Sequence, residues 1–372
     1  MKSLLKFELY KIFRQKSIYA VYVLLLALIM ISLNAQQAVN NSAYYKDWEG
    51  TLTAEKYSQA EAAYSELMKA ENEKASWSNE ARMQAAVFET IDTVRRLDET
   101  NKYSVEFLPG YLTQLEKKTF EYRKNALVLR MLENVEVNKL YYHKAPAEMI
   151  DFVNIFGTML SGALILIGLA PIFSNEYMSG MDQFQLSSRH GRRIGVRAKI
   201  AAALIYTSFV IVVWQLFNFV HRIVVYGNGG WQTPLQQIFQ YRAAPYDYDL
   251  LTFIFVQLGM HALGAFGFAL IVLLISAWCR HTMMSIVLSG AVYAFPIAIT
   301  VFFKIELGKY EDILDFTYTN VMRITSLFAE FKVINLFGLP VLYPYVAIVV
   351  MAVLSIAATM LLFYTMKRRE VA

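Results

Sequence analysis

The sequence predicts an all-α integral membrane protein of six transmembrane helices. Both termini are expected in the cytoplasm, and a helical extracytoplasmic domain is expected between the first two spans. Three observations lead to this fold class: 56% of the 372 residues are hydrophobic, they gather in discrete runs, and Lys and Arg cluster beside those runs. About half of a soluble domain is apolar, so the excess here does not fit a single buried core.

The spans are predicted where about 20 apolar residues follow one another, enough to cross the hydrocarbon layer. They cover 17–33, 149–173, 200–220, 251–278, 283–303 and 341–366. The fifth contains Pro296, which a membrane helix tolerates where neighbours satisfy the freed carbonyl. The N-terminal run follows a long charged leader and has no small-residue cleavage site, so we interpret it as a span and not as a cleaved signal peptide.

The short connecting segments predict the orientation. Lys and Arg are concentrated in the leader 1–16, the loop 174–199, the loop 279–282 and the tail 367–372. Six spans place all four segments on one side, and an excess of Lys and Arg marks the cytoplasmic side. The outer loop 221–250 carries only two arginines. We therefore expect a multi-pass protein of a bacterial plasma membrane with cytoplasmic termini.

The segment 34–148 is long enough to form a domain, predicted to be extracytoplasmic and helical. Apolar residues recur at helical spacing from Met83 to Leu97 and again from Leu112 to Leu132. Pro109 is expected in the first turn of the second of these helices. The pattern indicates a bundle that packs on itself, and a cap that grips a ligand or partner stays open as an alternative.

Two further segments are predicted to lie at the membrane surface. The leader 1–16 is an amphipathic helix by its spacing, and its polar residues are expected at the cytoplasmic interface among lipid headgroups. These membrane-interface residues are Lys6, Glu8, Lys11 and Arg14. The outer segment 304–340 is apolar but too charged to span, which favours re-entrant or interfacial helices before the last span.

Motifs for chemistry are missing from the sequence. It contains no GxxxxGK[ST] loop, no HExxH pair and no nucleophile elbow. We therefore predict no enzyme, no catalytic residue, no metal ligand and no cofactor on this chain, so that any ATP that drives the protein is bound by another chain. The single cysteine, Cys279, excludes an intramolecular disulfide. Basic residues follow the apolar runs, which does not indicate nucleic-acid binding.

A few polar residues fall inside the predicted spans, where such groups are costly and usually face protein or water. They are His261, Gln257, Gln215 and Asn218. One interpretation is the lining of a polar pathway. The other, more common for a lone neutral histidine or an amide, is hydrogen bonding between helices.

The loop 174–199 contains more than topogenic charge. Tyr177, Met181 and Phe184 follow one another at helical spacing, and Glu176 and Asp182 precede the basic cluster, as the helix dipole favours. The loop therefore predicts a short cytoplasmic helix. Its exposed apolar side chains suggest contact with a partner protein.

Three stretches carry a resemblance to a known family. They are the leader FELYKIFRQKS, the loop residues Glu176, Gly180, Leu186, Ser187, Ser188, Arg189 and Lys199, and the last outer segment followed by a span that ends in Lys367, Arg368 and Arg369. With these features the chain resembles the permease subunits of ABC-2 type transporters, which share the six-span, ABCG-like transmembrane architecture. Met181 departs from the pattern, since the family more often has Thr there.

The resemblance implies a coupling helix in the loop 174–199 that docks on a separate ABC ATP-binding subunit. It assigns Glu176, Gly180 and Arg189 to this segment. To these we add Arg192 and, for the apolar contact, Tyr177, Met181 and Phe184. The implied partners are that subunit, with its ATP and Mg, and a second permease protomer, in a homodimer or a heterodimer. Two such protomers would work by alternating access.

Two functions are carried forward from the sequence. The first is a permease subunit of an ATP-driven exporter, whose substrate is left open between a peptide antibiotic, a lipid and a drug. The alternative is a membrane sensor or scaffold, whose extracytoplasmic domain binds a ligand or partner and whose loop recruits a soluble protein.

Overall fold

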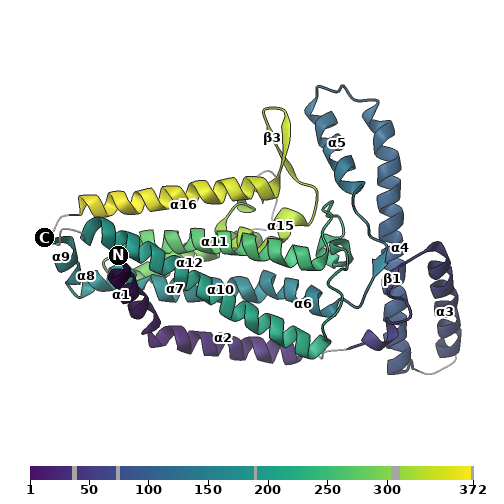
Figure 1. Ribbon diagram of the computed structural model, residues 1–372, viewed down its shortest axis with the longest axis horizontal. Coiled ribbons are helices and arrows are strands. Elements are labelled where there is room, and N and C mark those ends of the chain that lie inside the picture. Colours follow the sequence, from purple (N-terminus) through teal and green to yellow (C-terminus); the bar gives the residue numbers. More distant parts are fainter. Residues whose placement is uncertain (36–39, 73–75, 188–190, 303–310, 370–372) are drawn as a thin grey trace.

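The computed structural model describes residues 1–35, 40–72, 76–187, 191–302 and 311–369, and these are mostly helical (Figure 1). Six helical stretches among them are long and apolar enough to cross a membrane, which fits a membrane-embedded protein. They are α2 (Lys16–Ala35), the continuous run of α6 (Lys144–Phe152), α7 (Thr158–Leu169) and α8 (Pro171–Met178), then α10 (Val196–Tyr226), α11 (Leu250–Trp278), α12 (Thr282–Phe302) and α16 (Tyr343–Arg368).

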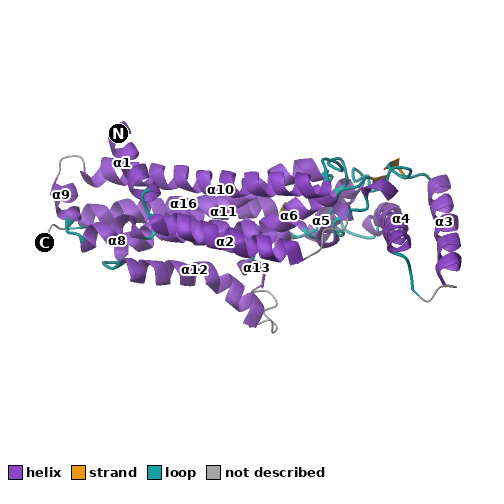
Figure 2. Cartoon of the chain, turned by 90° about the horizontal axis from the view of Figure 1, so that it is seen from below, coloured by secondary structure: helices purple, strands orange, loops and turns teal. Residues whose placement is uncertain are grey.

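Helix α11 lies at the centre of this bundle. It packs against α7, α8, α10, α12 and α16, and most of its side chains are buried. Helices α2 and α12 lie at the periphery, with most of their apolar surface exposed, as lipid-facing helices require (Figure 2). The buried core includes Leu164, Trp214, Phe268, Leu273 and Leu362.

Both chain termini lie at one end of the bundle, which we call the terminal end (Figure 1). Helix α1 (Lys2–Phe13) and helix α9 (Met181–Ser187) are also at this end. At the opposite end lies a separate helical unit, the distal domain, formed by the described residues between 40 and 143.

The distal domain is built from α3 (Ala54–Asn72), α4 (Asn79–Leu112) and α5 (Phe120–Leu132). A two-residue ladder closes it, where β1 (Gly50–Thr51) pairs antiparallel with β2 (Lys139–Leu140). Val87, Ile91 and Val94 of α4 are buried in its core, at the helical spacing that the sequence shows. The distal domain therefore packs on itself.

Pro109 lies elsewhere than the sequence predicts. It falls in the last turn of α4, which ends at Leu112, while α5 begins only at Phe120. The start of α5 is set instead by Thr119, whose hydroxyl accepts a hydrogen bond from the Tyr122 amide at 3.2 Å. A capping side chain satisfies an otherwise unpaired amide, and this local bond decides the helix start.

The segment before the last span contains short helices and also a hairpin that the sequence did not predict. Its described residues form α13 (Glu311–Leu314), α14 (Tyr318–Arg323) and α15 (Thr325–Phe328), followed by an antiparallel hairpin of β3 (Val333–Leu336) and β4 (Leu339–Leu342). Phe337 and Gly338 both have positive φ, as a tight two-residue hairpin turn requires. Arg123 of α5 donates to the Gly338 carbonyl at 2.9 Å, so the hairpin is tied to the distal domain.

Candidate functional site

The described part of the predicted loop 174–199 begins with the end of one helix, α8, and continues with a second helix, α9. Helix α8 ends at Met178, Gly180 adopts a left-handed φ of +69°, and α9 starts at Met181. The Ser179 hydroxyl donates to the carbonyls of Asn175 and Glu176 at 3.0 and 3.2 Å. A glycine with positive φ just after a helix is a common stop signal. Gly180 thus places Tyr177 and Met181 on separate helices.

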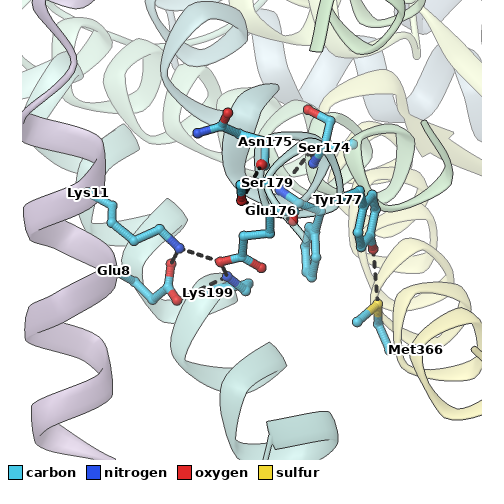
Figure 3. A network of polar contacts seen from close by, with 11 residues as sticks. Glu8, Lys11, Ser174, Asn175, Glu176, Tyr177, Ser179, Lys199 and Met366 are labelled. Atoms are coloured by element: carbon cyan, nitrogen blue, oxygen red, sulfur yellow. Dashed lines mark hydrogen bonds and ion pairs between the residues drawn. The ribbon is translucent and has the colours of Figure 1, made fainter. Parts of the chain in front are cut away.

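Glu176 belongs to a network of alternating charges drawn in Figure 3. Its Oε1 atom is ion-paired with the Nζ atoms of Lys11 and, at 2.5 Å, of Lys199. Glu8 completes the ring, with Oε1 at 3.0 Å from Lys199 Nζ and Oε2 at 2.9 Å from Lys11 Nζ. We call these four residues, which come from α1, α8 and α10, the charge ring.

Three of the four members of the charge ring are buried, and Lys11 is half-buried. The Lys199 side chain is 2% exposed, and those of Glu8 and Glu176 are also buried. Removing an ion from water costs several kcal/mol, so each charge here depends on the other three. Burial by itself lowers the pKa of the Lys11 ammonium, but the carboxylates of Glu176 and Glu8 outweigh burial and raise that pKa above its usual value.

The charge ring fixes the two ends of the loop. Glu176 stands where the loop begins and Lys199 where it ends, and both are held to α1 through Glu8 and Lys11 (Figure 3). The structure thus brings the predicted coupling residue Glu176 together with two predicted interface residues. Lys6 and Arg14 stay exposed outside the ring, with Arg14 over the Tyr10 ring at 5.8 Å.

The predicted apolar stripe is divided between two environments. Tyr177 packs inward against the end of the chain: its hydroxyl donates to Met366 Sδ at 3.6 Å, and the Arg369 guanidinium lies 3.5 Å from the centre of its ring. Met181 and Phe184, one turn apart on α9, are 49% and 74% exposed. These last two form what we call the α9 face.

Two basic residues of the predicted coupling segment are not placed. Arg189 lies outside the described residues. Of Arg192 the structure describes only the backbone, within the turn η3 (Gly191–Gly195). Met178, which the sequence analysis did not select, is also exposed beside Gly180. One residue after Tyr177, it points about 100° away around α8, so helical geometry predicts that the two side chains face different surroundings.

His261 connects four helices through hydrogen bonds in the middle of the bundle. Its Nδ1 atom lies 3.0 Å from the Met322 carbonyl, so Nδ1 is the donor. A neutral imidazole then accepts at Nε2 from the Ser161 hydroxyl at 2.8 Å, and Ser161 accepts from Trp214 Nε1 at 3.0 Å. The chain of bonds crosses from α10 through α7 and α11 to α14.

The three amides of the predicted pathway differ in their partners. Gln257 donates to the Ile150 carbonyl and to Asn154 Oδ1 at 3.0 and 3.1 Å, and Asn218 donates to the Met149 carbonyl at 3.1 Å. Gln215 is half-buried. Its Oε1 atom, like Oε1 of Gln257 and Oδ1 of Asn218, accepts no hydrogen bond from the described residues. His261, Gln257 and Asn218 therefore link helices, as the second interpretation of the sequence has it.

The described residues contain no group of three or more His, Cys, Asp or Glu side chains that could hold a metal ion. Comparisons of the chain with protein-family models, with curated proteins and with solved structures found no match. The functional assignment therefore depends on the arrangement at the terminal end.

Proposed function

We propose that this chain is the permease subunit of an ATP-driven exporter of the ABC-2 type. In this proposal two permease protomers associate in a plasma membrane, and separate ATP-binding subunits, which hold ATP and Mg, dock on the terminal end. The chain itself carries out no chemistry. One observation carries the proposal: the loop between the second and third apolar stretches is locked at both ends by the charge ring and presents the α9 face outward.

This arrangement suits the transmission of force. A partner that binds α9 and changes shape does work on the membrane part only if it binds two conformations with different affinity. A loose loop would absorb such a displacement. Here Glu176 and Lys199 join the end of α8 and the start of α10 to α1, so that a push on α9 moves all three helices together.

The charge distribution supports the proposed orientation, with the terminal end in the cytoplasm and the distal domain outside. Lys367 and Arg368 occupy the last turn of α16, Arg193 lies in η3, and Arg197 lies in the first turn of α10. All four lie at the terminal end, where an excess of Lys and Arg marks the cytoplasmic side.

The test is co-expression with an ATP-binding subunit from a neighbouring reading frame. We expect the two chains to co-purify and the assembly to hydrolyse ATP. The variant Met181→Asp/Phe184→Asp buries two charges in the proposed contact, and losing even one apolar anchor of an interface costs more than about 1 kcal/mol. We therefore expect co-purification to fall by at least about tenfold.

The control is Phe337→Asp, which adds a charge in the turn of the β3–β4 hairpin, at a side chain that is 98% exposed. Both variants must elute as monodisperse protein. If the α9 variant co-purifies as well as the control does, α9 is not the docking element and the proposal fails.

The sensor or scaffold function has one observation in its favour. The distal domain contains a cavity of about 360 Å³ whose lining includes Tyr57, Tyr64 and Phe88. A soluble partner that binds the loop without hydrolysing ATP, in a manner that depends on a ligand of the distal domain, would favour this function over export.

A further inference from the structure

A second site lies at the terminal end, away from the charge ring. It is a cavity of about 390 Å³ between the turn that leads into α10 and the end of α16. The π-helical segment η3 packs against α16, which brings these two parts of the chain together. The cavity is lined by Arg193, Arg197, Phe363, Tyr364 and Lys367.

The charge of this cavity is one-sided. Arg193, Arg197 and Lys367 supply three cations, and none of the described lining residues is acidic. Guanidinium groups bind phosphate oxygens through two parallel hydrogen bonds, and a lysine adds a point charge. The polar part of the cavity therefore fits a phosphate group.

The apolar part of the cavity continues along α16. Phe363 and Tyr364 form one wall, and residues three, four, seven and eight positions earlier on a helix fall on the same side. Met360 and Ile356 stand at those positions and are 66% and 54% exposed. Below the cationic rim, an apolar surface thus extends toward the middle of the bundle, where acyl chains of lipid lie.

We propose that this cavity binds the headgroup of an anionic phospholipid from the leaflet at the terminal end. The phosphate would lie among Arg193, Arg197 and Lys367, and an acyl chain would follow Tyr364, Met360 and Ile356 along α16. Basic pockets between membrane helices bind such headgroups. A free phosphate would use the cations but leave the apolar surface uncovered. The site goes beyond the proposed permease function and does not depend on an ATP-binding subunit.

The test compares two triple variants of the purified chain in nanodiscs or by native mass spectrometry, with phosphatidylglycerol against phosphatidylcholine. The cavity variant is Arg193→Gln/Arg197→Gln/Lys367→Gln. The control is Lys2→Gln/Lys6→Gln/Lys16→Gln, which removes the same charge from exposed positions at or next to α1. General attraction to an anionic surface falls equally in both. We expect the cavity variant to bind phosphatidylglycerol at least about tenfold more weakly than the control.

Equal losses in the two variants would show surface electrostatics alone and overturn the proposal. So would inorganic phosphate that raises the unfolding temperature of the wild-type chain as much as phosphatidylglycerol does, because the site would then take a free anion. Should the triple cavity variant not fold, Arg193→Gln alone replaces it, against Lys6→Gln as its control. The single variant is expected to lose about threefold in lipid affinity, and no loss relative to its control overturns the proposal.

Discussion

Lys199 of α10 lies 3.0 Å from Glu8 of α1, across 191 residues of sequence, and both side chains are buried. Helix α1 is therefore packed into the bundle by more than its apolar face. Phe13 of the same helix adds edge-to-face ring contacts with Tyr206 and Phe209 of α10, at 5.8 and 5.1 Å between ring centroids. The amphipathic leader is thus packed against α10 and ion-paired with Glu176 of α8, the helix that precedes α9.

Replacing Lys199 with Met is expected to destabilise the protein severely. The variant leaves the carboxylates of Glu8 and Glu176 with only Lys11 between them, and removing one partner of a buried ion pair costs about 3–5 kcal/mol. Thermal unfolding in detergent, followed by scanning fluorimetry, measures the loss. Lys102→Met, which breaks an exposed pair with Asp98, should cost no more than about 1 kcal/mol.

The double variant Glu176→Gln/Lys199→Met tests whether the ring acts as a unit. It removes one charge of each sign and leaves Glu8 paired with Lys11. We expect it to be more stable than the sum of the two single changes predicts, by about 0.5–3 kcal/mol. Simple additivity would show that the four charges do not depend on one another.

The parts of the fold that local periodicity determines were predictable. The six apolar helices lie where 20-residue apolar runs occur, and Val87, Ile91 and Val94 are buried at the expected helical spacing. The hairpin β3–β4 was not predicted, because four-residue strands leave little periodic pattern to recognise. The membrane orientation and the placement of the distal domain outside the cell stay predictions.

The candidate site was predictable only in part. Sequence pointed to the loop and to Gly180, since a glycine between helical segments is a local signal. The pairing of Glu176 with Lys199 and Glu8 depends on how α1, α8 and α10 pack, and local sequence does not encode that. The sequence does contain one signal for the pairing of Glu176 with Lys199. They are opposite charges at the ends of two apolar runs, where an ion needs a partner.

Helix α11 and helix α14 approach closely at Gly264, which gives a further prediction. A Cβ atom on Gly264 would lie 2.9 Å from Met322 Cγ and 3.0 Å from the Tyr318 carbonyl. Gly264→Ala should therefore destabilise the protein by about 1–3 kcal/mol through overpacking. It should also weaken the bond between His261 and the Met322 carbonyl, one turn away.

Gly259→Ala is the matched control on the same helix. Apart from its two chain neighbours and the backbone of its own helix, no described atom lies within 4 Å of its Cβ position, so the alanine gains helix propensity at no steric cost. Its unfolding temperature should stay level or rise. Equal unfolding temperatures for the two variants would contradict the close packing of α11 on α14.

Two glutamines differ in what their Nε2 groups donate, since Oε1 of both is buried without a partner among the described residues. Gln257→Leu removes the donor to the Ile150 carbonyl and to Asn154, and an orphaned buried group costs about 1–3 kcal/mol. Gln215→Leu removes an Oε1 atom that has no partner among the described residues, so it should be neutral or stabilising. Thermal unfolding of the two variants measures whether Gln257→Leu loses more stability than Gln215→Leu does. An equal loss in the two would argue that Gln215 has a role that its contacts do not explain.

The last prediction concerns pH and the segment between α13 and β3. Asp315 is buried and lies 3.4 Å from Lys332 Nζ. Burial raises the pKa of its carboxyl above the usual 3.8, and the hydrogen bond from Ser326 and the charge of Lys332 offset this only in part. A group whose pKa is raised by folding takes up protons more readily in the folded state. Its contribution to stability is full below pH 3.8 and is lost as the pH rises through the raised value.

Hydrogen exchange of residues 311–336 should therefore be slower at pH 5 than at pH 7, once the intrinsic effect of pH on exchange is removed. Asp315→Asn carries no titrating proton and should flatten this difference while the exchange of α11 stays unchanged. Asp312→Asn, which changes an exposed carboxyl three residues away, should leave most of the difference in place. Faster exchange at pH 5 in the wild-type chain would mean that the Lys332 ion pair outweighs burial and that the sign of the shift is the reverse.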